Sequence, residues 1–259
     1  MSVLDVATLN IWHDSGPWPQ RRELILDELM RLKPDLVGLQ EVLDQPGGPN
    51  QAEELAVPLG YEVAYAAASR RSDGVWQGNA LLSRRPVRRS ETIALPAEGV
   101  EPRALLLTLV DTADGELPVC VTHLAWEHAH AAVRTRQVEA ALGAIDEAVA
   151  ELPEALPAVL MGDFNAAPGA GELSALQDGW VDAWLIGGHG PGATFDPEND
   201  YARAWDESAE RIDYVFVEDD PRALVGRAEI VFAAPTVIEG DRIWPSDHYG
   251  VLCQLELRT

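Results

Sequence analysis

This chain lacks the features of a membrane-spanning, secreted or disulfide-stabilised protein. No apolar run reaches the roughly 18 residues that a membrane-spanning helix needs. The first residues, MSVLDVATLN, contain neither the basic region nor the apolar core of a secretory signal. Cys120 and Cys253 are the only cysteines, and each lies in an apolar, strand-like run that favours a buried free thiol. We therefore expect a protein without a membrane span that resides in the cytoplasm.

Basic residues are also scarce. The 259 residues include 43 Asp and Glu against 19 Lys and Arg, which gives a net charge of -24, and Lys33 is the single lysine. A field this negative repels polyanions, so nucleic acid is disfavoured as a substrate, though still possible. The densest cluster of bases can either guide a phosphate or form a solvated strand edge; it comprises Arg70, Arg71, Arg84, Arg85, Arg88 and Arg89.

Several catalytic motifs are missing as well. The sequence has no G-x-S-x-G serine hydrolase motif, no P-loop and no dinucleotide-binding fingerprint. The segment HLAWEHAH holds His123, His128 and His130, but it lacks the H-E-x-x-H spacing of zinc proteases. We interpret His128 and His130 as residues at the start of a helix.

The chain is rich, by contrast, in apolar runs of strand length. They occupy residues 3–11, 34–42, 61–68, 77–83, 104–110, 117–124, 156–165, 211–217 and 248–257, and several are apolar on both faces. Apolar residues at helical spacing predict helices over 20–33 and 133–152. The Gly-, Pro- and Asp-rich segment 185–210 is expected to be a long loop that shapes a site. Together these patterns predict one layered α/β domain over residues 1–259, with mixed sheets rather than a βαβ repeat.

Polar residues with catalytic potential stand at the ends of these strands. Taken singly, each has an ordinary structural role as a cap, a turn or a solvated position. Strand ends that gather at one rim of a sheet, however, place such side chains in one pocket. The set consists of Asn10, Glu41, His123, Asp163, Asn165, Asp213, Asp247 and His248.

These residue types suit metal-assisted hydrolysis of a phosphoester. Glu41 with Asp163, Asp247 or Asn10 offers the hard oxygen ligands that Mg²⁺ or Mn²⁺ prefers. The histidines and the Asn165 amide can bind phosphate oxygens, and Asp213 can orient the His248 ring. On an extended chain, Asp163 and Asn165 would point to the same side, the first toward water and the second toward phosphate.

The ordered motifs resemble those of the endonuclease/exonuclease/phosphatase family. The resemblance runs from residue 3 to residue 257 through TLNIW, LQEV, GNALLSRRP, VTHL, GDFNAAP, RIDYVF and SDHYGV, in the family's order. It implies a DNase I-like, four-layer α/β/β/α sandwich of two packed mixed sheets flanked by helices. The site is then expected at one edge of the two sheets.

The resemblance also assigns roles. It implies that Glu41 is the main Mg²⁺ ligand, with Asn10 close by and Asp247 on the other side of the pocket. Asp163 would orient or deprotonate the attacking water, while Asn165 and His123 would bind the phosphate. His248 paired with Asp213 would be either the general base or a phosphate clamp, and the proton's acceptor, Asp163 or His248, is left open.

Departures from the family patterns narrow the branch. Trp12 stands where abasic-site endonucleases carry an acid, and the signatures of inositol polyphosphate 5-phosphatases are missing. The two histidines are more similar to the sphingomyelinase-like and DNase I-like branches. Where the DNase I-like branch places an acid to pair with the first histidine, this chain has the neutral Gln77 and Asn79.

We therefore predict a Mg²⁺- or Mn²⁺-dependent phosphodiesterase, expected to be a monomer, that acts on a small phosphodiester or a phospholipid-like headgroup. A nuclease acting on DNA or RNA is the first alternative, and a metal-binding scaffold without activity is the second. Tryptophans near the motifs form either an aromatic wall of the site or ordinary packing; they are Trp12, Trp18, Trp126 and Trp244.

Overall fold

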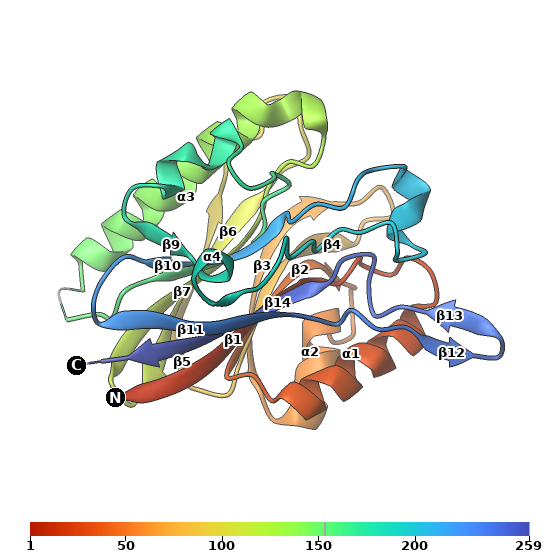
Figure 1. The fold of residues 1–259 in the computed structure, drawn as a ribbon, viewed down its shortest axis with the longest axis horizontal. Helices are drawn as coiled ribbons and strands as arrows, with labels where there is room; N and C mark the ends of the chain where they lie inside the picture. Colours follow the sequence, from red (N-terminus) through yellow and green to blue (C-terminus); the bar gives the residue numbers. More distant parts are fainter. Residues whose placement is uncertain (153, 259) are drawn as a thin grey trace.

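Strands that are apolar on both faces require a covering layer on each side, and the fold supplies both. The computed structural model of the protein describes residues 1–152 and 154–258. In it, two six-stranded mixed sheets pack face to face, with helices on their outer faces (Figure 1). The predicted four-layer α/β/β/α sandwich is confirmed.

The first sheet contains both ends of the chain. Its strands, in spatial order, are β11 (Ala223–Val231), β14 (Gly250–Leu257), β1 (Ser2–Asn10), β2 (Leu36–Asp44), β4 (Trp76–Ser83) and β3 (Glu62–Arg70). The second sheet has the order β5 (Val87–Ala94), β6 (Ala104–Thr112), β7 (Gly115–His123), β8 (Val159–Asp163), β10 (Asp213–Glu218) and β9 (Trp180–Asp182). A separate small hairpin joins β12 (Thr236–Ile238) and β13 (Asp241–Ile243).

The helices are few compared with the strands. They are α1 (Trp18–Leu32), α2 (Gln51–Ala56), α3 (Ala131–Ala150) and α4 (Ala183–Gly187), with 3₁₀ turns η1 (Val57–Leu59), η2 (His128–His130), η3 (Gly171–Leu176) and η4 (Ala202–Trp205). The two predicted helices correspond to α1 and α3, and η2 leads into α3 as the interpretation of His128 and His130 requires. Helix α2 was not predicted, although Asn50 and Glu53 form a capping box at its start.

Three apolar layers hold the sandwich together. Side chains such as Val6 of β1 and Val121 of β7 meet between the sheets. On the outer faces, Ile25 and Leu29 of α1 pack on the first sheet, and Ile145 of α3 packs on the second. Because both faces of each sheet are covered, the central strands are apolar throughout rather than alternating.

Each sheet contains one parallel pair of strands joined through a helix. In the first sheet, β1 and β2 are parallel and α1 connects them; in the second, β7 and β8 are parallel and α3 connects them. The crossover brings the carboxyl ends of both strands to the same edge of the sheet. The polar residues that end these four strands are therefore collected at two adjoining edges.

Other predictions can be checked against the same architecture. Cys120 and Cys253 are buried and free, as predicted. The segment 185–210 is not wholly a loop, because its first residues form the end of α4 and residues 202–205 form η4. The Asp182 side chain caps α4 by accepting a hydrogen bond from the Trp184 amide at 3.0 Å. No helix within the described ranges is both long and apolar enough to cross a membrane.

The arginine cluster of β3 to β5 is largely neutralised by acids. Arg71 lies 2.8 Å from Asp14, Arg85 lies 3.5 Å from Asp35, and Arg88 pairs with Asp111. Of the two roles predicted for the cluster, guiding a phosphate or forming a solvated strand edge, these contacts favour the strand edge, because the paired charges are not directed at a common anion.

Candidate functional site

The four parallel strand ends bring the predicted residues together. The carboxyl end of β7 lies beside that of β8, with His123 opposite Asp163, and β10 adds Asp213 opposite Asp163 from the other side. In the first sheet, Asn10 ends β1 and Glu41 lies in β2, next to the residue that pairs with Asn10. These edges lie at one end of the sandwich (Figure 1).

A cavity of about 390 Å³ opens at this end of the molecule. The predicted residues that line it are Asn10, Glu41, His123, Asp163, Asn165, Asp247 and His248. Asp213 is fully buried behind His248. The structure thus brings all eight predicted side chains to one place.

Asp163 is the centre of the arrangement. Its Oδ2 accepts a hydrogen bond from Asn10 Nδ2 at 3.0 Å and lies 3.4 Å from His123 Nε2 and 3.8 Å from His248 Nε2. Burial, reinforced by the nearby Asp213 carboxylate, raises the pKa of Asp163 to about 7 despite the opposing effect of His248. A carboxylate with such a pKa can accept a proton near neutral pH.

His248 and Asp213 form a buried pair. His248 Nδ1 lies 2.9 Å from Asp213 Oδ2, so the ring directs Nε2 toward Asp163 and the cavity. Burial by itself would lower the pKa of His248, but the carboxylates of Asp213 and Asp163 outweigh it and hold that pKa well above its usual range. The imidazole is therefore a cation that faces the cavity.

His123 has a different partner from the one sought in the sequence. Arg103 Nη1 lies 3.4 Å from His123 Nδ1, and Asn79 instead donates a hydrogen bond to the Ala104 carbonyl. Burial, followed by the Arg103 charge, lowers the pKa of His123 well below its usual value, so the ring is neutral. Sequence reasoning missed Arg103, because an arginine just before a strand gives no signal that it will face the site.

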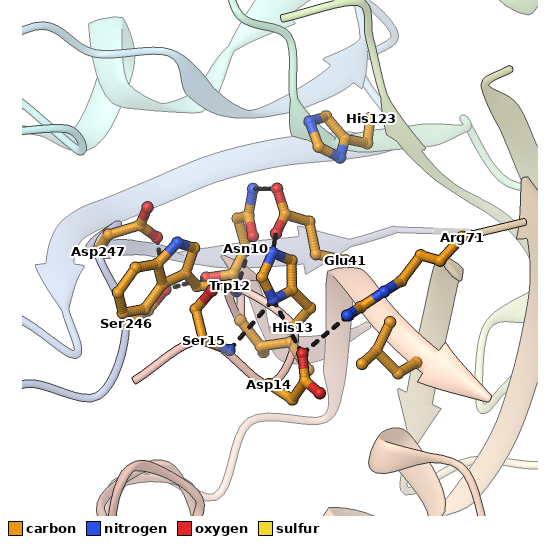
Figure 2. A network of polar contacts seen from close by, with 12 residues as sticks. Asn10, Trp12, His13, Asp14, Ser15, Glu41, Arg71, His123, Ser246 and Asp247 are labelled. Atoms are coloured by element: carbon orange, nitrogen blue, oxygen red, sulfur yellow. Dashed lines mark hydrogen bonds and ion pairs between the residues drawn. The ribbon is translucent and has the colours of Figure 1, made fainter. Parts of the chain in front are cut away.

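Glu41 and Asp247 stand on the other side of the cavity (Figure 2). Asn10 Nδ2 donates a hydrogen bond to Glu41 Oε1 at 3.2 Å, while Asn10 Oδ1 accepts a hydrogen bond from the backbone N–H of Trp12 at 2.9 Å. Burial, opposed by His248 and reinforced by Glu41, raises the pKa of Asp247 to about 6. These two carboxylates therefore repel each other in a poorly solvated site.

Such a donor set fits a hard divalent cation. Two acidic side chains supply oxygen ligands at the wall of a cavity, and a cation between them would relieve their repulsion. A second group, Asp163, Asp213 and His248, has ligand atoms that all lie within 4.8 Å of one another. In that group His248 already supplies the compensating positive charge, so the wall with Glu41 and Asp247 fits a metal ion better.

The backbone at the site is locally strained. Glu41 has a φ of 60°, where the register of β2 against β4 shifts between Leu39 and Val42. Left-handed backbone at residues other than glycine is uncommon and clusters at functional sites. This bulge turns the Glu41 side chain toward the cavity instead of into the sheet.

Asp163 and Asn165 are adjacent for a reason other than the predicted one. The strand ends at Asp163, and Asn165 has a φ of 49°, so the two residues do not follow the alternation of an extended chain. Instead, the backbone N–H of Asn165 donates a hydrogen bond to Asp163 Oδ1 at 2.9 Å, which closes a tight turn. The prediction that an extended chain points Asp163 and Asn165 to the same side was wrong, although both side chains do line the cavity.

His13 is a further site residue that the sequence analysis missed. Its Nε2 lies 3.8 Å from Glu41 Oε2, and its Nδ1 accepts a hydrogen bond from the Ser15 amide at 3.1 Å (Figure 2). A single histidine in a loop gives little sequence signal, because only the tertiary fold places it beside Glu41.

The tryptophans divide between the two predicted roles. Trp12 and Trp126 line the cavity, whereas Trp18 packs on the core and Trp244 is buried against Tyr249. Trp205, which the sequence analysis did not consider, lines the cavity and lies edge-on to Trp126 with ring centres 6.1 Å apart.

Two packed mixed sheets flanked by helices, with carboxylates and histidines gathered at one end, are the architecture of the DNase I-like class. The sequence profile of the Endonuclease/Exonuclease/phosphatase family matches residues 7–248. The chain therefore belongs to this family.

Individual proteins with similar sequences or structures agree with the family assignment. The chain is 32% identical over 176 residues to the uncharacterized protein YbhP of Escherichia coli K12, a match that covers 62% of this chain and 66% of YbhP, just under two thirds of that relative. It is 26% identical to tyrosyl-DNA phosphodiesterase 2 of Mus musculus, over 99% of this chain and 67% of that protein. The structure of truncated Caenorhabditis elegans TDP2 has the same fold, with a TM-score of 0.79, 21% identity and 98% coverage of both chains.

Proposed function

We propose that this protein is a Mg²⁺- or Mn²⁺-dependent phosphodiesterase that works by in-line attack of water on phosphorus. The observation that carries the proposal is the position of Asp163, held by Asn10 and facing the cationic His248 in a cavity whose other wall carries Glu41 and Asp247. General base, phosphate-binding cation and metal ligands would then converge on one space.

Asp163 is proposed as the group that takes the proton from water. Its raised pKa allows it to accept a proton near neutral pH, and the Asn10 amide keeps Oδ2 in place. His248, held as a cation by Asp213, would bind a phosphate oxygen as negative charge develops. Of the two candidates for the proton's acceptor, Asp163 and His248, we therefore propose Asp163.

A metal ion would be held by Glu41 and Asp247 with Asn10 beside them, and when bound it would polarise the phosphoryl oxygen as a Lewis acid. The neutral His123 would donate a hydrogen bond to the phosphate from the opposite wall, together with the Asn165 amide. Arg103, buried beside His123 with its Nε free of hydrogen bonds among the described residues, adds a positive charge there.

The charge around the cavity favours a small substrate. Carboxylates of Glu101, Glu207 and Glu210 line it together with the tryptophans, and the chain as a whole carries a net charge of -24. A long polyanion would meet strong repulsion on approach, whereas a small phosphodiester or a phospholipid-like headgroup, with far fewer charges, would meet much less. A cavity of about 390 Å³ is of a size that encloses a small ligand.

Cleavage of a phosphodiester in DNA is the second candidate. It is favoured by the similarity to the mouse protein, whose name describes a phosphodiesterase acting on tyrosyl-DNA. Short single-stranded oligonucleotides therefore belong in the substrate screen beside headgroup diesters.

The test is hydrolysis of an aryl phosphodiester with Mg²⁺ or Mn²⁺. We expect chelation to abolish turnover and Asp163→Asn to lower kcat by about 10²- to 10⁴-fold, the usual contribution of a general base. The control is Asp146→Asn, the same change on the solvent side of α3. Full activity in chelator or in Asp163→Asn would refute the mechanism, and metal binding without any turnover would identify an inactive scaffold.

A further inference from the structure

Arg21 of α1 is fully buried, with 0% of its surface exposed. Arginine is almost never fully buried unless its charge is compensated. No carboxylate forms a salt bridge with Arg21 among the residues that the structure describes. Its guanidinium must therefore be satisfied in another way.

Backbone carbonyl oxygens take every hydrogen-bond donor of this guanidinium. Its five hydrogen bonds run from Nε to Ser15 (2.9 Å), from Nη1 to Ile11 (2.7 Å) and Pro245 (3.0 Å), and from Nη2 to Trp12 (3.1 Å) and His13 (2.8 Å). An arginine has five N–H groups, so none remains for a substrate phosphate. The side chain is thus committed to holding backbone.

The carbonyls belong to the two segments that flank the proposed metal site. Residues 11–15 follow Asn10 and carry His13, and Pro245 lies two residues before Asp247. Ser246 reinforces the junction, because its Oγ donates to the Asn10 carbonyl at 2.6 Å (Figure 2). Arg21 and Pro245 are 224 positions apart in the chain, so this hydrogen bond joins a segment near the start of the sequence to one near its end.

The first segment has a backbone that would not persist without support. Trp12 and His13 have φ angles of 55° and 35°, two consecutive left-handed residues that are not glycine. Each such conformation costs on the order of 1 kcal/mol or more and survives only where the surroundings impose it. The rings of Trp12 and Trp18 add to that support, since both lie about 5 Å from the guanidinium carbon, at 5.1 and 5.2 Å.

We propose that Arg21 is a positioning residue that fixes residues 11–15 and 245–248 relative to each other and so sets the geometry of Asn10, Glu41 and Asp247 for a divalent cation. The inference rests on the proposed function of the same site. Only the planar fork of arginine can reach five carbonyls at once; lysine keeps the charge but offers three donors from a single nitrogen. The shape of the side chain, and not its charge alone, is what the site requires.

A second buried arginine provides a matched comparison. Arg134 of α3 donates from Nη1 to the carbonyls of Ala125 and Glu127, both at 2.9 Å, and pairs with Glu172. It holds the segment that carries Trp126, which contains none of the proposed metal ligands. The two arginines share burial and carbonyl contacts; they differ in which segment they hold and in that Arg134 also has a carboxylate partner.

The experiment measures Mn²⁺ affinity by calorimetry and by the electron paramagnetic resonance of free Mn²⁺, on folded protein and without substrate. We expect Arg21→Lys to weaken Mn²⁺ binding roughly tenfold or more, the size of effect seen when support for metal ligands is lost. Arg134→Lys should leave Mn²⁺ affinity unchanged. Leu29→Ala, on the same buried face of α1, controls for lost stability and should also leave it unchanged.

The outcomes separate this proposal from the proposed function. If the wild type binds Mn²⁺ and Arg21→Lys binds it equally well, the positioning role is overturned while the phosphodiesterase stands. If Leu29→Ala weakens Mn²⁺ binding as much as Arg21→Lys, the effect is general destabilisation and the role is again overturned. The second variant is Arg21→Gln, which keeps two donors. If both Arg21 variants fail to fold while Leu29→Ala folds, Arg21 has a purely structural role and the positioning role is overturned. A wild type that binds no Mn²⁺ overturns both proposals.

Discussion

At the level of single residues, burial and pairing decide what each ionisable group can do. Asp163 and His248 are both buried, yet the first is pushed toward its neutral form and the second toward its charged form. Burial alone favours the neutral form of both groups. Asp213 is a like charge for the Asp163 carboxylate, so it adds to the effect of burial there; it is an opposite charge for the His248 imidazole, so together with Asp163 it reverses the effect.

Replacing Asp213 by asparagine tests this arrangement. Without this anion the largest charge that opposes burial is gone, so the pKa of His248 falls and the positive charge where phosphate would bind is weakened. We expect kcat/KM for an aryl phosphodiester to fall by about 10²- to 10³-fold, comparable to losing one strong stabilising donor. Steady-state kinetics beside Asp146→Asn measures it, and a loss of less than a few-fold would show that the Asp213 charge is dispensable.

At the level of elements, the two strand–helix–strand units explain why the site forms where it does. Each unit delivers two strand ends to one edge, and packing the sheets face to face brings the two edges together. The close approach of β7 and β8 depends on Gly162, whose φ is 144° and where an added Cβ would lie 1.9 Å from the Thr122 carbonyl oxygen. A side chain at this position cannot be accommodated without moving a strand that carries Asp163.

A pair of glycine substitutions makes the point measurable. Gly162→Ala should lower the free energy of unfolding by more than about 3 kcal/mol, because it combines a backbone clash with a conformation that alanine disfavours. Gly143→Ala, in the exposed middle of α3 with nothing within 4 Å of the new methyl group, should raise it by about 0.5 to 1 kcal/mol. Urea denaturation of both variants provides the test, and equal effects would contradict it.

At the level of the whole molecule, the excess of acids shapes both stability and substrate access. Carboxylates concentrated at one cavity repel one another until a cation binds, so metal binding should stabilise the fold. At about 100 times its dissociation constant, Mg²⁺ or Mn²⁺ should raise the free energy of unfolding by about 2.7 kcal/mol. Thermal melts with and without chelator measure this, and a Glu41→Gln variant should lose most of the gain; an unchanged melting temperature would contradict a metal site.

The same charge predicts how activity responds to salt. A small diester should be cleaved with a kcat/KM that changes little between about 50 mM and 200 mM salt, because it has only one phosphate whose contacts salt can screen. A single-stranded oligonucleotide tracked through many phosphates would instead show a steep decline. Rates measured on both substrates across this range decide between a small-molecule enzyme and a nuclease.

Much of the site could be predicted because its main residues follow directly on apolar strands. Asn10, Glu41, His123 and Asp163 each end or interrupt a run whose period already identifies it, so local pattern and chain order were sufficient. Arg103 and His13 could not be found this way. Both lie near apolar runs, but nothing in the local sequence indicates their roles, which follow from side chains 20 or more positions away.

By itself, the sequence pattern determined a layered α/β domain with mixed sheets, the order of its main strands and helices, and the polar groups at the strand ends, since hydrophobic period and strand termination are local properties. The four-layer arrangement was implied by the family resemblance. Only the tertiary structure decided how those groups are held: the left-handed turn that joins Asp163 to Asn165, the Arg103 beside His123, and the Arg21 carbonyl network between residues 11–15 and 245. These features depend on contacts between segments far apart in the chain, and no local pattern specifies which distant carbonyl a buried guanidinium will meet.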